Sequence, residues 1–247
     1  MLSIAFLYAP HMVIYRKQQR QPVEEKNMSD DEIIKIIDNL KFPLEGINFD
    51  RLELYAKHEN WEIRNAVAII LAQTDHKQGE KILLELVNDT DELIRANACD
   101  SLGSYSSESV IKVLKKKAVN DLQLVRGYAV LSLGNIAFRK KDEDIHSFLK
   151  SASKKEKSIW VKINLYYNLC ILGEIEYVYE IIREIDNKFY KNRYLAIQSL
   201  LDLYKEHDFN KNTSALYLRK KICKRLEKET SKAVYEIGEE LVKQLSQ

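Results

Sequence analysis

IRANACDSLG at residues 94–103 and VRGYAVLSLG at residues 125–134 are the segments that decide the fold. Each begins with a β-branched residue and an arginine, has an alanine three residues after the arginine, and ends in Leu-Gly. Apolar and small residues at these offsets form one stripe of an α-helix, and the small ones let a neighbouring helix approach closely. Because Arg95 and Arg126 are 31 residues apart, the two segments are copies of one internal repeat.

The period extends in both directions from these copies. Related segments follow basic residues spaced by 31, 31, 36 and 31 residues, namely Arg64, Arg95, Arg126, Lys162 and Arg193. Another amphipathic stretch precedes each copy, such as residues 82–87, and a polar turn such as residues 88–91 joins the two. The unit is therefore predicted to be helix, turn, helix. We place the insertion of the longer interval at residues 139–144 and expect an exposed loop there.

The combination of a leucine-rich helix, an Asp-containing turn and a second helix with Ile/Val-Arg, Ala and Leu-Gly resembles the short HEAT-like repeat family. This family includes the repeats of phycobilin lyases. The resemblance implies an all-α fold, a right-handed α-α superhelix of about five to six helix pairs. Such a motif is specific for the fold and says little about function.

The expected organisation follows from where the regular period begins and stops. It comprises an N-terminal extension at 1–28, a capping helix at 29–46, five HEAT-like repeats at 47–204, and C-terminal capping helices at 205–247. In the first cap, Ser29 and Glu32 have the spacing of a capping box that opens a helix, and Pro43 should end it. A further hypothesis is that translation starts at Met28, because Glu24-Glu25-Lys26 implies purine-rich codons just upstream.

Composition agrees with a helical fold and excludes several classes of protein. The chain has 7 Gly and 3 Pro, and the last Pro is Pro43, so few breakers follow it. A net charge of +2 gives no global attraction to nucleic acid. Three cysteines without paired spacing favour neither a disulfide framework nor a zinc site and suggest a reducing cytoplasm. The chain contains no phosphate-binding glycine loop or nucleophile motif, so we expect no enzyme and no cofactor.

The repeat itself suggests roles for its basic and small residues. In the HEAT-like family the arginine commonly pairs with acidic turn residues and carbonyl groups between repeats, and Asp89 and Asp121 stand in such turns. Cysteines at repeat positions that are otherwise small or apolar are expected in the core, as is the cysteine nearer the C-terminus: Cys99, Cys170 and Cys223. The histidines lack metal-ligand spacing and are expected at the surface: His11, His58, His76, His146 and His207.

Function is predicted to lie on the concave face, which second helices line in HEAT-like stacks. Positions two, five and nine residues beyond each basic residue should point there, and none of them is Lys or Arg. The candidate partner-binding residues are Asn97, Asp100, Tyr128, Leu131, Asn135, Asn164, Tyr167, Gln198 and Asp202. A groove for nucleic acid would be rich in cations. This polar, faintly acidic and aromatic set instead suits a protein partner.

The leading hypothesis is a non-enzymatic scaffold, adaptor or immunity-type protein that binds a protein partner on its concave face. One alternative is a nucleic-acid-binding or DNA-repair protein, since HEAT-like stacks occur in alkylpurine DNA glycosylases. It depends on a C-terminal basic cluster, otherwise expected to be a solubilising cap: Arg219, Lys220, Lys221, Lys224, Arg225, Lys228 and Lys232. The other alternative, suggested by the repeat resemblance alone, is a lyase-like subunit of the phycobilin lyase type.

Overall fold

The computed structural model describes residues 28–206 and 215–246, except for the side chains of residues 47 and 206. The predictions for residues 1–27, including the choice of start codon, and those for His11 and His207 lie outside the described residues. Within these ranges the chain forms thirteen α-helices and short 3₁₀ turns, with no strand. No described helix is both long and apolar enough to cross a membrane.

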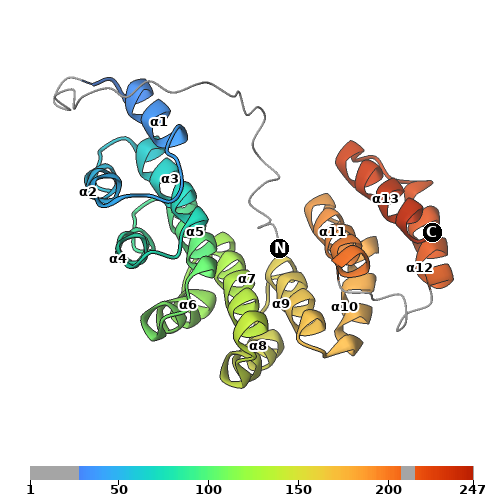
Figure 1. Cartoon of the computed structure of the whole chain (residues 1–247). Coiled ribbons are helices and arrows are strands. Elements are labelled where there is room, and N and C mark those ends of the chain that lie inside the picture. The colour runs from blue at the N-terminus through green and yellow to red at the C-terminus, as the bar shows by residue number, and fades with distance from the viewer. Residues whose placement is uncertain (1–27, 207–214, 247) are drawn as a thin grey trace.

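The helices form two layers of an arch (Figure 1). The outer layer contains the first helix of each pair: α2 (Gly46–Tyr55), α4 (Lys77–Leu86), α6 (Glu108–Asn120), α8 (Glu143–Lys155), α10 (Val178–Arg183) and α12 (Ala215–Leu226). The inner layer contains the second helices: α3 (Trp61–Ile70), α5 (Glu92–Ser101), α7 (Gln123–Lys140), α9 (Ile159–Ile171), α11 (Tyr190–Glu206) and α13 (Lys232–Gln244). The described part of the chain therefore contains six helix pairs, and α12 and α13 form the sixth.

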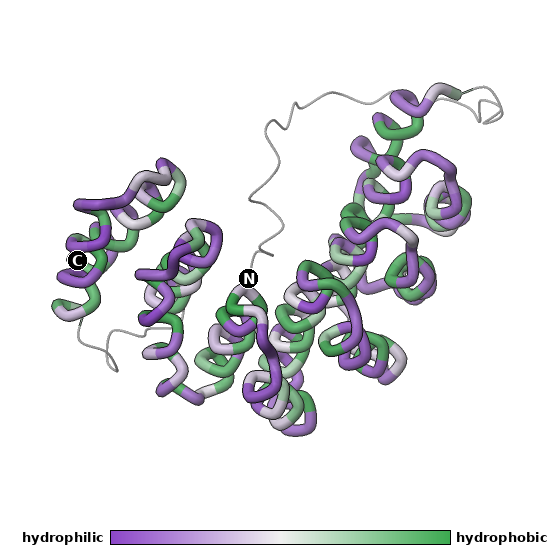
Figure 2. The backbone as a smooth tube through the Cα atoms, turned by 180° about the vertical axis from the view of Figure 1, so that it is seen from behind, coloured by the Kyte–Doolittle hydropathy of each residue, from purple (hydrophilic) through white to green (hydrophobic). Residues whose placement is uncertain are grey.

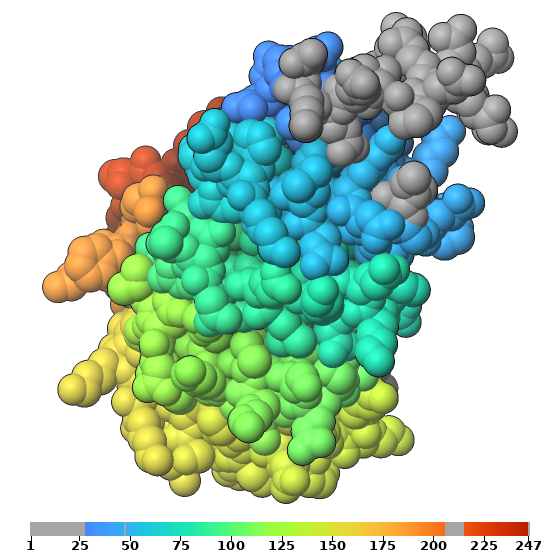
Figure 3. All heavy atoms as spheres, turned by 90° about the vertical axis from the view of Figure 1, so that its left-hand side faces the viewer, coloured from blue at the N-terminus to red at the C-terminus, as the bar shows by residue number. Residues whose placement is uncertain are grey.

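The pairs stack in chain order, so each one contacts mainly its neighbours (Figure 3). Every helix carries both hydrophobic and hydrophilic residues, as expected for helices with one buried face (Figure 2). Their apolar sides build two adjoining cores, one from α1 (Asp30–Asp38) to α9 and the other from α7 to α13. Inner helices contact one another more extensively than outer helices do, which curves the stack toward the inner layer.

Local signals explain how several helices begin. The Ser29 N–H donates to the Glu32 carboxylate at 2.9 Å, as the predicted capping box requires, and α1 begins at Asp30, directly after this cap. Asn60 caps α3, and Asp91 caps α5, each accepting a backbone N–H of the first turn.

The predicted loop at residues 139–144 is only partly a loop. These residues are largely exposed, but α7 continues to Lys140 and α8 begins at Glu143. The apolar stripe of α7 runs on through the buried Ile136 and Ala137, so the helix continues where shorter copies end in a 3₁₀ turn. The extra residues therefore lengthen α7.

Candidate partner-binding surface

The recurring arginines form a ladder that joins most of the helix pairs to the next one. Arg95 Nη2 lies 2.9 Å from Asp121 Oδ1 in the turn of the following pair, while Arg95 Nη1 donates to the Asp89 carbonyl oxygen at 2.9 Å. The same arrangement recurs in Arg64 with Asp89, Arg126 with Glu156, and Arg193 with Glu229. This confirms the predicted pairing and shows that the ladder arginines are engaged inside the stack.

Each ladder carboxylate also organises the start of the next inner helix. Glu229 Oε1 accepts the Ser231 N–H at 2.9 Å, and Asp121 Oδ1 accepts the Leu122 N–H at 2.8 Å. Burial alone would raise the pKa of Glu229, but hydrogen bonds from Arg193, the Ser231 N–H and Arg225 outweigh it and lower this pKa from 4.5 to about 2. The pKa values of the other three ladder carboxyls are lowered for the same reason.

One rung of the ladder is missing. Lys162 takes the place of the arginine on α9, and Asn187 takes the place of the turn carboxylate before α11. Asn187 Oδ1 still accepts the Phe189 N–H at 3.0 Å, as the carboxylates do for their helices. Lys162, however, forms no ion pair with any residue that the structure describes. Pairs four and five are therefore joined without the clasp that the other junctions have.

A second set of polar contacts, which the sequence analysis missed, links the inner helices directly. Ser101 Oγ donates to the Ala68 carbonyl at 2.7 Å, and Ser132 Oγ to the Cys99 carbonyl at 2.7 Å. Asn168 Nδ2 donates to the Val130 carbonyl at 3.0 Å. Six residues after the basic position the repeat carries Ser, Ser, Asn and Ser in copies two to five, and this regularity was the available signal.

The glycines of the repeat make room for these contacts. A Cβ at Gly134 would lie 1.9 Å from Asn168 Oδ1, and one at Gly103 would lie 2.9 Å from Ser132 Oγ. Gly127 accommodates the Trp160 ring in the same way, since a Cβ there would be 1.9 Å from a ring carbon. Small residues therefore set the close spacing of α5, α7 and α9.

The cysteines do not form a reactive site. Cys99 and Cys170 are buried, as predicted, and burial raises the pKa of each thiol to about 12. Cys223 is exposed, so its predicted place in the core is wrong. It lies on the outward side of α12, next to the buried Ile222 that anchors this helix.

The described histidines have local roles at or near the surface. His76 is exposed, caps α4 and stacks on Phe49 with ring centroids 4.5 Å apart. His58 and His146 are partly exposed, and His146 Nε2 lies 3.4 Å from the Glu174 carboxylate.

The inner face exposes only part of the predicted partner-binding set. Asn135 is exposed, and five further residues are partly exposed: Asn97, Asp100, Tyr128, Gln198 and Asp202. Hydrogen bonds on the inner face engage several of these side chains, because Asn97 Nδ2 donates to Asn65 Oδ1 at 2.7 Å and Gln198 Nε2 donates to Asp202 Oδ1 at 2.8 Å.

Three predicted residues are buried, which corrects the expectation that they are accessible. Leu131 and Tyr167 are each 9% exposed and belong to the second core, and Asn164 is 1% exposed. The Trp160 ring packs on Gly127, so α7 and α9 approach closely, and neighbouring side chains cover these three positions. The Asn164 Nδ2 group has no hydrogen-bond partner among the described residues.

A hollow of about 460 Å³ lies between α11 and α13 and includes Gln198. Its floor contains the buried Leu201 and Ile237, and its rim carries an ion pair between Lys205 and Glu240. The remaining lining residues are Tyr194, Ala233 and Glu236. The α13 side of this hollow gives no signal in the sequence, because α13 lacks the repeat signature: Tyr235 stands where the ladder arginine would be, four residues after the helix cap at Ser231.

Two layers of stacked helix pairs, clasped by a recurring arginine, define the armadillo-like and HEAT-like class of α-solenoid repeat proteins. Residues 50–134 match the family model described as HEAT repeats, so this segment consists of HEAT repeats. The ladder and the helix pairs continue well beyond the matched residues.

Comparisons with solved structures agree on the fold. YibA of Escherichia coli is 16% identical, with a TM-score of 0.54 over 90% of this chain and 75% of that chain. The complex of CpcE and CpcF of phycocyanin lyase from Nostoc contains a chain that is 15% identical, with a TM-score of 0.51 over 93% of this chain and 100% of that chain. At these identities the likeness concerns the fold alone. A search of curated proteins finds no match.

Proposed function

We propose that this protein is a non-enzymatic scaffold that binds a protein partner on its inner face. The observation that carries the proposal is the set of side chains that stay accessible on that face after the ladder residues and the core residues are set aside. Among the predicted positions, the accessible ones are amides, acids and a tyrosine, as in Asn135, Asp100 and Tyr128, and the ladder arginines are engaged elsewhere. HEAT repeats serve as interaction surfaces, and a partner protein suits such a face better than a polyanion does.

The hollow between α11 and α13 supplies a place for an anchoring side chain. Its apolar floor and polar rim resemble the usual arrangement of a protein interface, in which polar groups surround a buried apolar contact. Gln198 and Glu236 on the rim can hydrogen-bond a partner backbone. We infer that a partner segment lies along the inner face and inserts one apolar side chain here.

The fold is compatible with a two-protein assembly, because a chain of similar architecture is part of the CpcE and CpcF complex. The same likeness is no argument for lyase chemistry in this chain, because a likeness at 15% identity concerns the fold alone.

The test compares an inner-face variant with a matched outer-face variant. Asn135→Arg introduces a large cation on the exposed inner surface of α7, and Ser151→Arg introduces the same side chain on the exposed surface of α8. Both proteins should fold alike by circular dichroism. Proteins captured from the native cell should include at least one that Asn135→Arg loses and Ser151→Arg retains, as measured by quantitative mass spectrometry. Identical capture by all three proteins would refute inner-face binding.

A further inference from the structure

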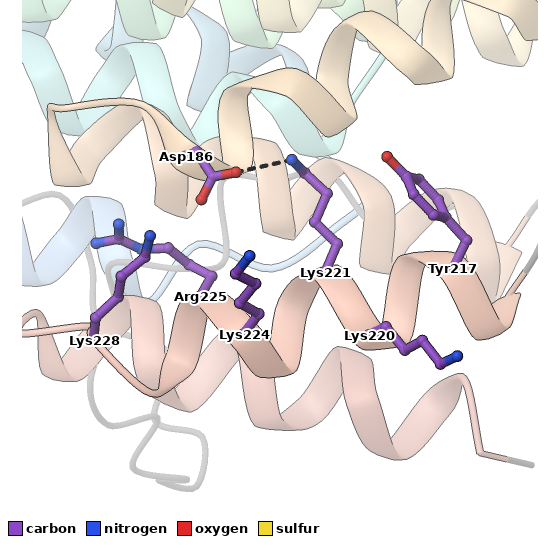
Figure 4. A pocket seen from close by; sticks show the side chains of 7 residues that line it. All are labelled: Asp186, Tyr217, Lys220, Lys221, Lys224, Arg225 and Lys228. Atoms are coloured by element: carbon purple, nitrogen blue, oxygen red, sulfur yellow. Dashed lines mark hydrogen bonds and ion pairs between the residues drawn. The ribbon is translucent and has the colours of Figure 1, made fainter.

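The outer helix α12 has a charge distribution unlike its surroundings. Its twelve residues, ALYLRKKICKRL, include five Lys or Arg and no acid. A shallow hollow of about 420 Å³ runs along this helix, lined by Asp186, Tyr217, Lys220, Lys221, Lys224, Arg225 and Lys228. Figure 4 shows these side chains, most of them carried by α12, with Lys221 reaching across to Asp186. We call this set the α12 basic face.

Two cations of the α12 basic face are already neutralised within the protein. Lys221 Nζ lies 2.8 Å from Asp186 Oδ2, and Arg225 Nη2 lies 2.9 Å from Glu229 Oε2. Lys220, Lys224 and Lys228 are exposed and form no ion pair with any described residue. These three are spaced by four residues, so they follow one side of the helix and the turn after it. They are positioned to receive an anion.

The basic face is short and bounded by carboxylates. From Tyr217 to Arg225 the helix rises about 12 Å, which three or four residues of an extended peptide would cover. On one side α12 packs against the 3₁₀ turn Glu184–Asp186, and on the other against α13, whose Glu239 is exposed. A nucleic acid carries phosphates along its whole length and would have to pass over these carboxylates. A short acidic segment of a protein could bind the lysines without passing over these carboxylates.

We propose that the α12 basic face binds a short Asp- or Glu-rich segment of a partner protein. The carboxylates of such a segment would pair with the side chains of Lys220, Lys224 and Lys228, and the half-exposed Tyr217 ring would offer apolar contact at one end. This site is on the outer layer and is independent of the inner-face proposal.

The experiment measures the fluorescence anisotropy of a labelled oligoglutamate peptide and of a thymidine oligonucleotide of equal charge, at low ionic strength. The variant K220S/K224S/K228S should bind the peptide about tenfold more weakly, from three exposed charge pairs. The control K112S/K116S/K154S removes the same charge from exposed lysines of α6 and α8 and should bind like the unmodified protein. Asn135→Arg should also leave peptide binding unchanged, which separates this site from the inner face.

Three results would overturn the proposal. One is the absence of peptide binding by the unmodified protein. Another is an equal loss of binding in the α6 and α8 control, which would mean that only net charge matters. The third is tighter binding of the oligonucleotide than of the peptide with the same dependence on Lys220, Lys224 and Lys228, which would assign the face to nucleic acid.

Discussion

Glu229→Gln tests the idea that the ladder clasps neighbouring helix pairs. The Glu229 side chain is 0% exposed and pairs with Arg193, whose side chain is 6% exposed, and with Arg225. Its pKa is lowered from 4.5 to about 2 because hydrogen bonds from the arginines and from backbone N–H groups outweigh its burial. At about 1.4 kcal/mol per pH unit between the two values, the ionised carboxylate stabilises the fold by about 3 kcal/mol at pH 7.

The sign of the pH dependence follows from the lowered pKa. The contribution is complete above about pH 5 and is lost as the pH falls toward 2, because the unfolded state then binds the proton more readily than the folded state. The glutamine variant mimics the protonated carboxyl. Its deficit against the unmodified protein should therefore be about 3 kcal/mol at pH 7 and shrink to about 1 kcal/mol at pH 3.

Urea unfolding followed by circular dichroism measures this deficit at each pH. Glu227→Gln is the matched control, because Glu227 is exposed and forms no ion pair with the described residues. Hydrogen exchange should locate the loss in α12 and α13, since the rung joins α11 to the turn between them. A deficit that stays constant with pH, or a deficit no larger than that of the control, would refute the clasp.

Three further predictions concern packing, thiol reactivity and the missing rung. Gly127→Ala should destabilise the protein by about 1–3 kcal/mol in urea unfolding, because its Cβ collides with the tryptophan ring, whereas Gly46→Ala, with open space around it, should not. A thiol reagent should label only Cys223 of the three cysteines in the native protein and all three in denaturant; rapid native labelling of a second thiol would contradict the burial described above. Lys162→Arg combined with Asn187→Asp should rebuild the missing rung and raise the free energy of unfolding by about 1–2 kcal/mol, and neither single change should do so.

The sequence by itself determined the repeat architecture. The period and the Ile/Val-Arg and Leu-Gly signatures were enough to place the inner helices, and the resemblance to HEAT-like repeats was enough to expect their arginines to pair with turn residues such as Asp89 and Asp121. These features can be recognised in the sequence because each copy stacks on its neighbour with similar residue types at the same offsets. The repeat thus specifies contacts between equivalent positions of successive pairs.

Only the tertiary structure decided which inner-face positions are accessible. Asn97 and Asn164 stand at the same offset, yet Asn164 is buried, because close packing of α7 and α9 covers that part of the inner face. The hollow beside Gln198 likewise depends on α13, which carries no repeat signature. The side chains of neighbouring helices decide whether a residue at a given offset is buried. A periodic pattern in the sequence does not show which of those side chains will cover it.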